Sequence, residues 1–275
     1  MIDFSRILDN VRSKTPLVHN ITNYVTVNDC ANILLACGGS PIMSDDEDEV
    51  EDITSICGGL NINIGTLNKD TIPSMFLAVK RANELKHPVL LDPVGAGASK
   101  LRTKTAARLI EEVKFTVIRG NISEIKALYQ GSGSTKGVDA DEADRVNDSN
   151  IDSVLAFAKS FSKKTGAIIA ITGATDIITD GERVCIITNG HPMMSKITGT
   201  GCMLSAMTTA FVTANPDNAF EAVCTAVIAM GLCGEKAHSL LTEHEGNSTL
   251  RDRLIDCIYN LTASELSEGA KYEMR

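Results

Sequence analysis

The chain has 275 residues, a formal net charge of −9 and 22% charged residues. This is the composition of an ordinary globular protein, and the length suits a single domain that covers residues 1–275. The sequence contains no basic block, so we expect neither nucleic acid nor an anionic membrane as a partner.

Apolar runs of strand length alternate with segments of helical periodicity. Strands are predicted where β-branched residues form nearly continuous runs, at 60–64, 89–91, 115–118 and 167–171. Helices are predicted where apolar residues recur three and four apart, at 72–85, 104–113 and 151–164. This alternation predicts an α/β fold with a central, mostly parallel β-sheet flanked by helices on both faces.

The pattern changes in the second half of the chain. Residues 131–150, rich in Gly, Ser, Asp and Asn, are predicted to form a loop. An Asp180-Gly181 pair between two short apolar runs predicts a β-hairpin over 177–188. Three helices are then predicted, at 201–213, 218–241 and 249–261.

Four other features bear on location and metal binding. The first six residues mix acidic, basic and apolar types and do not form a signal peptide, so we expect a cytoplasmic protein. The mostly apolar stretch 222–232 is too short to span a bilayer. Six of the eight cysteines lie in apolar segments, which favours reduced core side chains over disulfides or a zinc site. Seven acidic residues in 45–52 are expected to open a helix rather than bind a metal.

Polar and glycine-rich residues follow each of the four predicted strands. They are Gly65-Thr66, Asp92-Pro93-Val94-Gly95-Ala96-Gly97, Arg119-Gly120-Asn121-Ile122-Ser123-Glu124 and Thr172-Gly173. Ligands of open α/β sheets bind beyond the carboxyl ends of the strands, so these segments predict one ligand-binding edge.

The segment Thr198-Gly199-Thr200-Gly201-Cys202 is predicted to bind an anion. Two glycines followed at once by a helix allow the backbone N–H groups of Gly199, Thr200, Gly201 and Cys202 to point at one spot, where the helix dipole also attracts negative charge. Such a hole stabilises charge on a transferred phosphoryl group. The alternative is that the glycines only begin a tightly packed helix. No Gly-Lys-Ser/Thr follows, so this is not a Walker A loop.

Asp92, Asn121 and Glu124 supply the oxygen ligands that Mg²⁺ prefers, and Arg119 offers a charged contact to nucleotide phosphates. Asn121 and Glu124 have an equally good structural interpretation. An Asn followed three residues later by Glu suits the start of a helix, as in a capping box.

Seven segments together resemble one known family. They are Pro16-Leu17-Val18-His19-Asn20-Ile21-Thr22-Asn23, Gly39-Ser40-Pro41-Ile42-Met43, Asn63-Ile64-Gly65-Thr66-Leu67, Asp92-Pro93-Val94-Gly95-Ala96-Gly97, Ile118-Arg119-Gly120-Asn121, Ile171-Thr172-Gly173 and Thr198-Gly199-Thr200-Gly201-Cys202. The sequence resembles the hydroxyethylthiazole kinases of thiamine salvage, members of the ribokinase-like superfamily, over nearly its whole length.

This resemblance implies transfer of the ATP γ-phosphate to the hydroxyl of 4-methyl-5-(2-hydroxyethyl)thiazole, with Mg²⁺. It places Met43, Gly199 and Asn23 at the thiazole, Arg119 and Thr172 at ATP, and Asp92, Asn121 and Glu124 in the metal and phosphate region. The family is trimeric, with substrate sites between subunits. We therefore expect a homotrimer.

Cys202 stands where most ribokinase-like enzymes have a catalytic Asp. A thiol at a helix N-terminus is expected to have a lowered pKa and to accept a proton. Phosphoryl transfer through a loose transition state needs little deprotonation of the attacking oxygen. We therefore predict that Cys202 mainly orients the substrate hydroxyl and contributes modestly as a base.

Three other functions remain open from the residues. One is a kinase for another small alcohol, such as a hydroxymethylpyrimidine or a sugar. A second is a cysteine-dependent hydrolase or transferase that pairs Cys202 with His19 or His191, although no sequence feature places either histidine beside Cys202. The third is a protein that binds thiazole or nucleotide without turnover.

Overall fold

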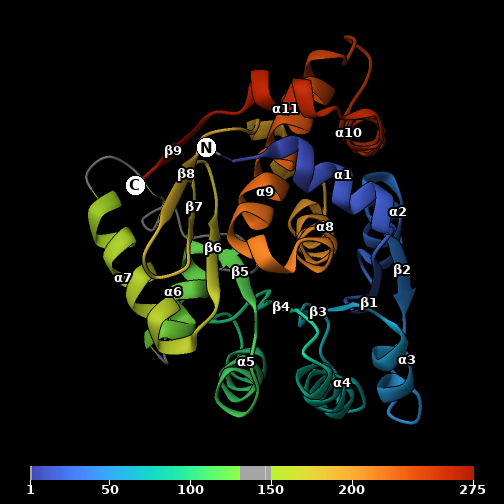
Figure 1. Ribbon diagram of the computed structural model, residues 1–275, viewed down its shortest axis with the longest axis vertical. Coiled ribbons are helices and arrows are strands. Elements are labelled where there is room, and N and C mark those ends of the chain that lie inside the picture. The colour runs from blue at the N-terminus through green and yellow to red at the C-terminus, as the bar shows by residue number, and fades with distance from the viewer. Residues whose placement is uncertain (1, 131–145, 147–149) are drawn as a thin grey trace.

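The computed structural model describes residues 2–130, 146 and 150–275 (Figure 1). Within these residues the centre is a nine-stranded sheet in the order β2-β1-β3-β4-β5-β6-β7-β8-β9. The strands are β1 (Leu17–Ile21), β2 (Ser40–Met43), β3 (Gly59–Asn63), β4 (Val89–Asp92), β5 (Val117–Asn121), β6 (Ile168–Thr172), β7 (Asp176–Thr179), β8 (Val184–Ile187) and β9 (Tyr272–Met274).

The strand directions divide the sheet into two parts. From β2 to β6 every neighbouring pair is parallel, and from β6 to β9 every pair is antiparallel. The antiparallel part includes the β7–β8 hairpin, which turns at Asp180-Gly181 with Gly181 at a φ of 94°. The predicted mostly parallel sheet and the predicted hairpin are both confirmed.

Helices cover both faces of the sheet (Figure 1). One face carries α1 (Phe4–Lys14), α2 (Val27–Cys37), α8 (Thr200–Ala214), α9 (Ala219–Ser239), α10 (Asn247–Asn260) and α11 (Ala263–Gly269). The other carries α3 (Val50–Ile56), α4 (Thr71–Leu85), α5 (Lys100–Glu112), α6 (Ile122–Gln130) and α7 (Ile151–Thr165). Two short 3₁₀ helices, η2 (Pro192–Lys196) and η3 (Pro216–Asn218), flank α8.

Each face of the sheet has its own hydrophobic core. Because side chains alternate along a strand, Val117 of β5 enters the core beneath α8 and α9, while the next residue, Ile118, enters the core beneath α4 to α7. This double burial explains why the central parallel strands read as continuous apolar runs.

Helix α9 is a long, apolar helix of the protein's core. Residues 216–239 have the length and composition of a membrane span, but 78% of the apolar 18-residue stretch within them is buried inside the molecule. It packs against α8 and α10, so its apolar surface is covered by protein. The cysteines are free thiols, and the six predicted to be core side chains are all buried, as is Cys202.

Some elements differ from the sequence prediction. Strands β1, β2 and β9 were not predicted. β1 contains the buried polar residues His19 and Asn20, and β2 is short and contains Pro41, so neither shows a continuous apolar run. The acidic run 45–52 leads into α3, as expected. The loop predicted at 131–150 lies almost wholly outside the described residues.

Candidate active site

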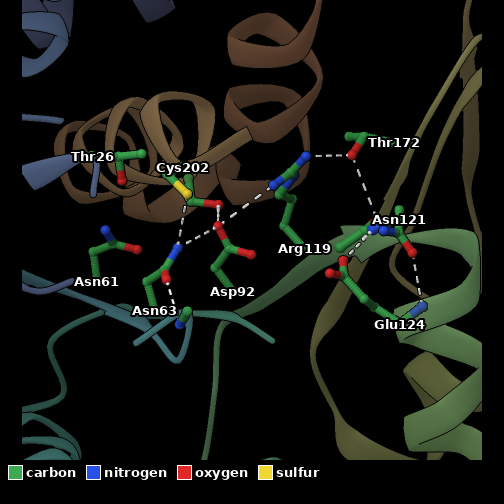
Figure 2. Close-up of polar contacts among 12 residues, drawn as sticks. Thr26, Asn61, Asn63, Asp92, Arg119, Asn121, Glu124, Thr172 and Cys202 are labelled. Atoms are coloured by element: carbon green, nitrogen blue, oxygen red, sulfur yellow. Dashed lines mark hydrogen bonds and ion pairs between the residues drawn. The ribbon is translucent and has the colours of Figure 1, made fainter. Parts of the chain in front are cut away.

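Polar side chains from four neighbouring strands meet at the carboxyl edge of the parallel sheet, beside the N-terminus of α8 (Figure 2). Asn63 ends β3 and is in register with Asp92, which ends β4. Asn121 ends β5 and is in register with Thr172, which ends β6. The polar strand ends therefore lie together at one edge of the sheet, as predicted.

The glycine loop forms the start of α8. Gly199 precedes the helix with a φ of 92°, and its carbonyl accepts the N–H of Met203 (2.8 Å). The N–H groups of Thr200, Gly201 and Cys202 come before that first intrahelical bond and are available to an anion. A side chain at position 199 would collide with Thr26, and one at 201 would lie 2.7 Å from Arg119 Nη1. Close packing and the positive φ thus require glycine at 199, whereas a side chain at 201 would displace the Arg119 guanidinium.

Asp92 is fully buried at the centre of the site. Its Oδ2 accepts hydrogen bonds from Ser205 Oγ (2.8 Å) and Asn63 Nδ2 (2.9 Å), and Arg119 Nη1 lies 3.5 Å away. Its Oδ1 is buried without a hydrogen-bond partner among the described residues. Burial raises the pKa of Asp92, although Arg119, Ser205 and Asn63 oppose the shift.

Arg119 joins Asp92 to the β6 side of the site. Its Nη2 donates to Thr172 Oγ1 (2.5 Å), while its Nε is buried without a partner among the described residues. A second buried carboxyl, Asp176, accepts the N–H of Gly173 (2.8 Å), and burial raises the pKa of Asp176 to about 7. Asp176 was not predicted as a site residue.

Asn121 and Glu124 form the start of α6. The Asn121 N–H donates to Glu124 Oε2 (2.8 Å), and the Glu124 N–H donates to Asn121 Oδ1 (2.9 Å), which is the capping-box interpretation of the sequence. Glu124 Oε1 accepts the N–H of Gly95 (2.8 Å). Burial, followed by the nearby charge of Asp92, raises the pKa of Glu124 to about 7.

Cys202 differs from the sequence prediction in one respect. Burial and the charge of Asp92 raise the pKa of the Cys202 thiol, whereas its position at a helix N-terminus predicted a lowered value. The thiol receives amide N–H groups from Asn23 (3.2 Å) and Asn63 (3.3 Å) and also hydrogen-bonds Thr26. The helix terminus was visible in the sequence, but the desolvation and the buried carboxyl were not.

A small hydrogen-bond network holds Cys202 in place (Figure 2). Asn23 Nδ2 donates to Asn63 Oδ1 (3.0 Å), and Asn23 Oδ1 accepts both the N–H and the hydroxyl of Thr26 (3.1 Å each). Of the three residues that surround Cys202, only Asn23 was predicted to belong to the site. Asn63 lies in a segment that carried the resemblance, and Ser205 lies one helical turn after Cys202, but neither spacing revealed a contact.

A pocket of about 180 Å³ opens beside this network. Its walls include Met43, Asn20, Asn63, Tyr24 and Met75. Asn63 connects the pocket to Cys202 and Asp92 through its hydrogen bonds. Met43 therefore lines a cavity, as predicted. Asn23 and Gly199 lie beside it rather than in its wall, since they contact Cys202 and Thr26 instead.

The two histidines considered as partners for Cys202 have other contacts. His19 bonds Thr54 and Ser44, and His191 stacks on His238 with ring centroids 3.5 Å apart. The Cys202 thiol has a raised pKa and accepts amide donors, and neither histidine is hydrogen-bonded to it as the base that activates a nucleophilic thiol would be. The geometry therefore disfavours a cysteine-dependent hydrolase or transferase.

Comparisons with known proteins agree on one family. A family model described as the hydroxyethylthiazole kinase family matches residues 8–264. The chain is 65% identical over 266 residues to hydroxyethylthiazole kinase of Clostridium acetobutylicum, covering 97% of each chain, and 51% identical to that of Clostridium tetani, covering 95% and 94%. The solved structure of a hydroxyethylthiazole kinase protein from Pyrococcus horikoshii is similar with a TM-score of 0.87 and 34% identity, over 99% of this chain and 98% of that one.

More distant structures share the fold alone. A pyridoxal kinase from Staphylococcus aureus is 17% identical with a TM-score of 0.62, over 94% of this chain and 97% of its own. A ribokinase-like superfamily protein from Enterococcus faecalis is 13% identical with a TM-score of 0.62, over 91% and 88%. The fold is thus ribokinase-like, as predicted, and the chain belongs to the hydroxyethylthiazole kinase family.

Proposed function

We propose that this protein transfers the γ-phosphate of ATP to the hydroxyl of 4-methyl-5-(2-hydroxyethyl)thiazole, as a single-domain enzyme of thiamine salvage. The observation that carries the proposal is a small pocket lined by Met43 and Asn63 that opens beside a buried Asp92 and the N-terminus of α8. A flexible thioether packs well against a heterocyclic ring, and the helix terminus receives negative charge.

Each predicted site residue has a role in this reaction. The heterocycle occupies the pocket at Met43, with its hydroxyl directed toward Asn23 and Cys202. Arg119 and Thr172 hold the ATP phosphates, and the N–H groups of the Gly199-Thr200-Gly201-Cys202 loop stabilise charge on the transferred group. Positioning and electrostatics supply most of the rate in such a site, because a loose transition state requires little proton abstraction.

Cys202 acts as a positioning residue in this proposal. Its thiol is held by Asn23, Asn63 and Thr26, and its raised pKa keeps it protonated near neutral pH. A protonated thiol suits this role, because a loose transition state requires little proton abstraction.

The donor set fits Mg²⁺ through Asp92. Asp92 Oδ1 is a hard, unpartnered oxygen beside the expected phosphates, whereas the oxygens of Glu124 and Asn121 Oδ1 already accept backbone N–H groups. We therefore propose Asp92 as the direct ligand, with Glu124 and Asn121 acting through water. When bound, Mg²⁺ neutralises charge on the phosphates.

The same proposal includes the cytoplasm as location and a homotrimer as assembly. Tyr24 and Val25 are 78% and 59% exposed, and Tyr24 borders both the thiazole pocket and an adjoining cavity of about 340 Å³ that includes Leu101 and Arg102. Exposed apolar residues at the rim of a site are suited to cover by a neighbouring subunit.

The decisive experiment measures ADP formation from ATP and Mg²⁺ with and without the thiazole alcohol. Thiazole-dependent ADP supports the proposal, and its absence overturns it. Parallel reactions with a hydroxymethylpyrimidine and with ribose test the other-alcohol alternative. A larger kcat/KM for either would reassign the substrate. Binding of the thiazole alcohol without ADP formation would indicate a non-catalytic binding protein.

A further inference from the structure

Strand β2 forms one wall of the thiazole pocket although it lies at the edge of the sheet. Among the strands that the structure describes it pairs with β1 alone, and the last paired residue is Met43, opposite Asn20. The next residue, Ser44, also lines the pocket but lies beyond the ladder. The position of this wall therefore depends on side-chain contacts, since no second strand supports it.

His19 supplies such a contact. It is fully buried in β1, next to Asn20, and its Nε2 lies 2.9 Å from the Ser44 carbonyl oxygen. Its Nδ1 lies 2.9 Å from the Thr54 hydroxyl of α3. A carbonyl only accepts, so Nε2 carries the proton and donates to Ser44, while Nδ1 of the neutral ring accepts from Thr54.

The surroundings keep the ring in this neutral tautomer. Burial lowers the pKa of His19, and this effect exceeds the opposing influence of the Ser44 carbonyl, Glu49 and Asp45. Glu49 also accepts the Ser44 hydroxyl. Ser44 is thus held at its carbonyl by His19 and at its hydroxyl by the residue that precedes α3.

We propose that His19 is a positioning residue for the substrate, which fixes the Met43–Ser44 wall of the pocket to α3 and so sets affinity for the small heterocyclic alcohol. The proposal rests on the function proposed above. His19 contacts neither the phosphate loop nor Arg119 through its hydrogen bonds, so its loss should weaken binding of the alcohol and leave phosphoryl transfer nearly intact.

The test compares KM for the thiazole alcohol, KM for ATP, kcat and the calorimetric Kd of the thiazole alcohol in four variants. His19→Leu removes the donor at similar volume and should raise KM and Kd for the alcohol about tenfold, with kcat and KM for ATP within about twofold of wild type. His19→Gln places an amide donor near the Nε2 position and should recover most of that loss. Thr54→Val leaves Nδ1 without its partner and should raise KM about threefold.

Ser162→Ala is the matched control. Ser162 is a buried residue of α7 whose hydroxyl donates to the Ala167 carbonyl (2.6 Å), so the substitution removes a similar side-chain-to-backbone bond away from the pocket. It should lower Tm without changing KM for the alcohol.

Several outcomes would overturn the proposal. They are an unchanged KM in His19→Leu, equal impairment in His19→Gln and His19→Leu, or a KM increase of the same size in Ser162→Ala. If His19→Leu does not fold, the Gln and Val variants decide by the same criteria. A wild-type protein that neither binds nor phosphorylates the thiazole alcohol overturns the proposed function and this inference together, whereas an active wild type with an insensitive His19 overturns only the inference.

Discussion

Cys202 and Asp92 belong to one hydrogen-bond network, but they differ in how fully their side-chain atoms are hydrogen-bonded. Cys202 receives two amide donors and contacts the Thr26 hydroxyl. Asp92 has one oxygen held by Ser205 and Asn63 and the other buried without a partner among the described residues. A fully partnered group is fixed in place, whereas a buried unpartnered oxygen is ready for a ligand. The residue that stands at the expected catalytic position is thus the better anchored but the less reactive of the two.

Substitution of Asp92 is the strongest test of this difference between Cys202 and Asp92. Asp92→Asn keeps the shape but removes the negative charge, and we expect kcat to fall about 10³-fold, the loss typical of a major electrostatic contact. Asp176→Asn, which changes another fully buried carboxyl on the same edge, should lower kcat less than about tenfold. Steady-state ADP formation and Tm measure both. Equal losses in the two variants would show that Asp92 has no special role.

Arg119 tests the nucleotide side. Arg119→Ala removes the guanidinium that bonds Thr172 and lies beside Asp92, so KM for ATP should rise about 30-fold, as expected for loss of a charged hydrogen bond. KM for the thiazole alcohol should change less than about threefold. A larger effect on the alcohol than on ATP would mean that the two substrate sides are reversed.

Substitution of Gly201 tests the position of the Arg119 guanidinium without removing the arginine. An alanine Cβ there would lie 2.7 Å from Arg119 Nη1, so Gly201→Ala must displace the guanidinium. KM for ATP should rise about tenfold, less than for removal of the arginine. Gly246→Ala, which adds a methyl group in open space at a negative φ before α10, is the control for a glycine substitution without a steric conflict. Both Km values and Tm should be compared, and unchanged ATP kinetics in Gly201→Ala would exclude the displacement.

A smaller effect is expected at Cys202. Cys202→Ala should retain activity within about fivefold of wild type, because the thiol orients the hydroxyl rather than forming a bond to it. Cys202→Asp should be equally or more active, since a carboxylate near the hydroxyl can accept its proton. ADP formation by both variants is the measurement. Complete loss in both would restore the nucleophile hypothesis.

The last prediction concerns the rate at which the Cys202 thiol is alkylated, which should be low at neutral pH. Burial and Asp92 raise its pKa, so the thiolate that reacts with iodoacetamide should be scarce at pH 7 and increase only above the ordinary value of 9.0. Mass spectrometry of the alkylated peptide as a function of pH measures this rate, with half-buried Cys257 as the internal comparison. Rapid alkylation of Cys202 below pH 8 would contradict the raised pKa.

The strands that could be predicted from the sequence are those in which the buried residues are also apolar. Strands β3 to β6 were recognised because their side chains are apolar on both faces. β1 was missed because His19 and Asn20 are polar yet buried, and their partners Ser44 and Asn61 are distant in sequence. A buried polar residue becomes interpretable only when its hydrogen-bond partner is known.

The site was predictable in position and less so in detail. Strand ends and the glycine loop located it, because the carboxyl ends of parallel strands meet at one edge. The protonation state of Cys202, the free oxygen of Asp92 and the role of Asn63 all depend on which side chains meet after folding. The spacing of residues along the chain does not reveal those side-chain contacts.

The apolar character of α9 has a consequence for synthesis of the protein in the cell. Before α8, α10 and the sheet have covered it, residues 216–239 present the same length and hydropathy as a membrane anchor. An emerging or truncated chain therefore exposes this apolar segment, and exposed apolar surface favours aggregation until the neighbouring helices pack over it. Substitutions that slow this packing should cause loss of protein to membranes or aggregates before they cause any loss of catalytic power.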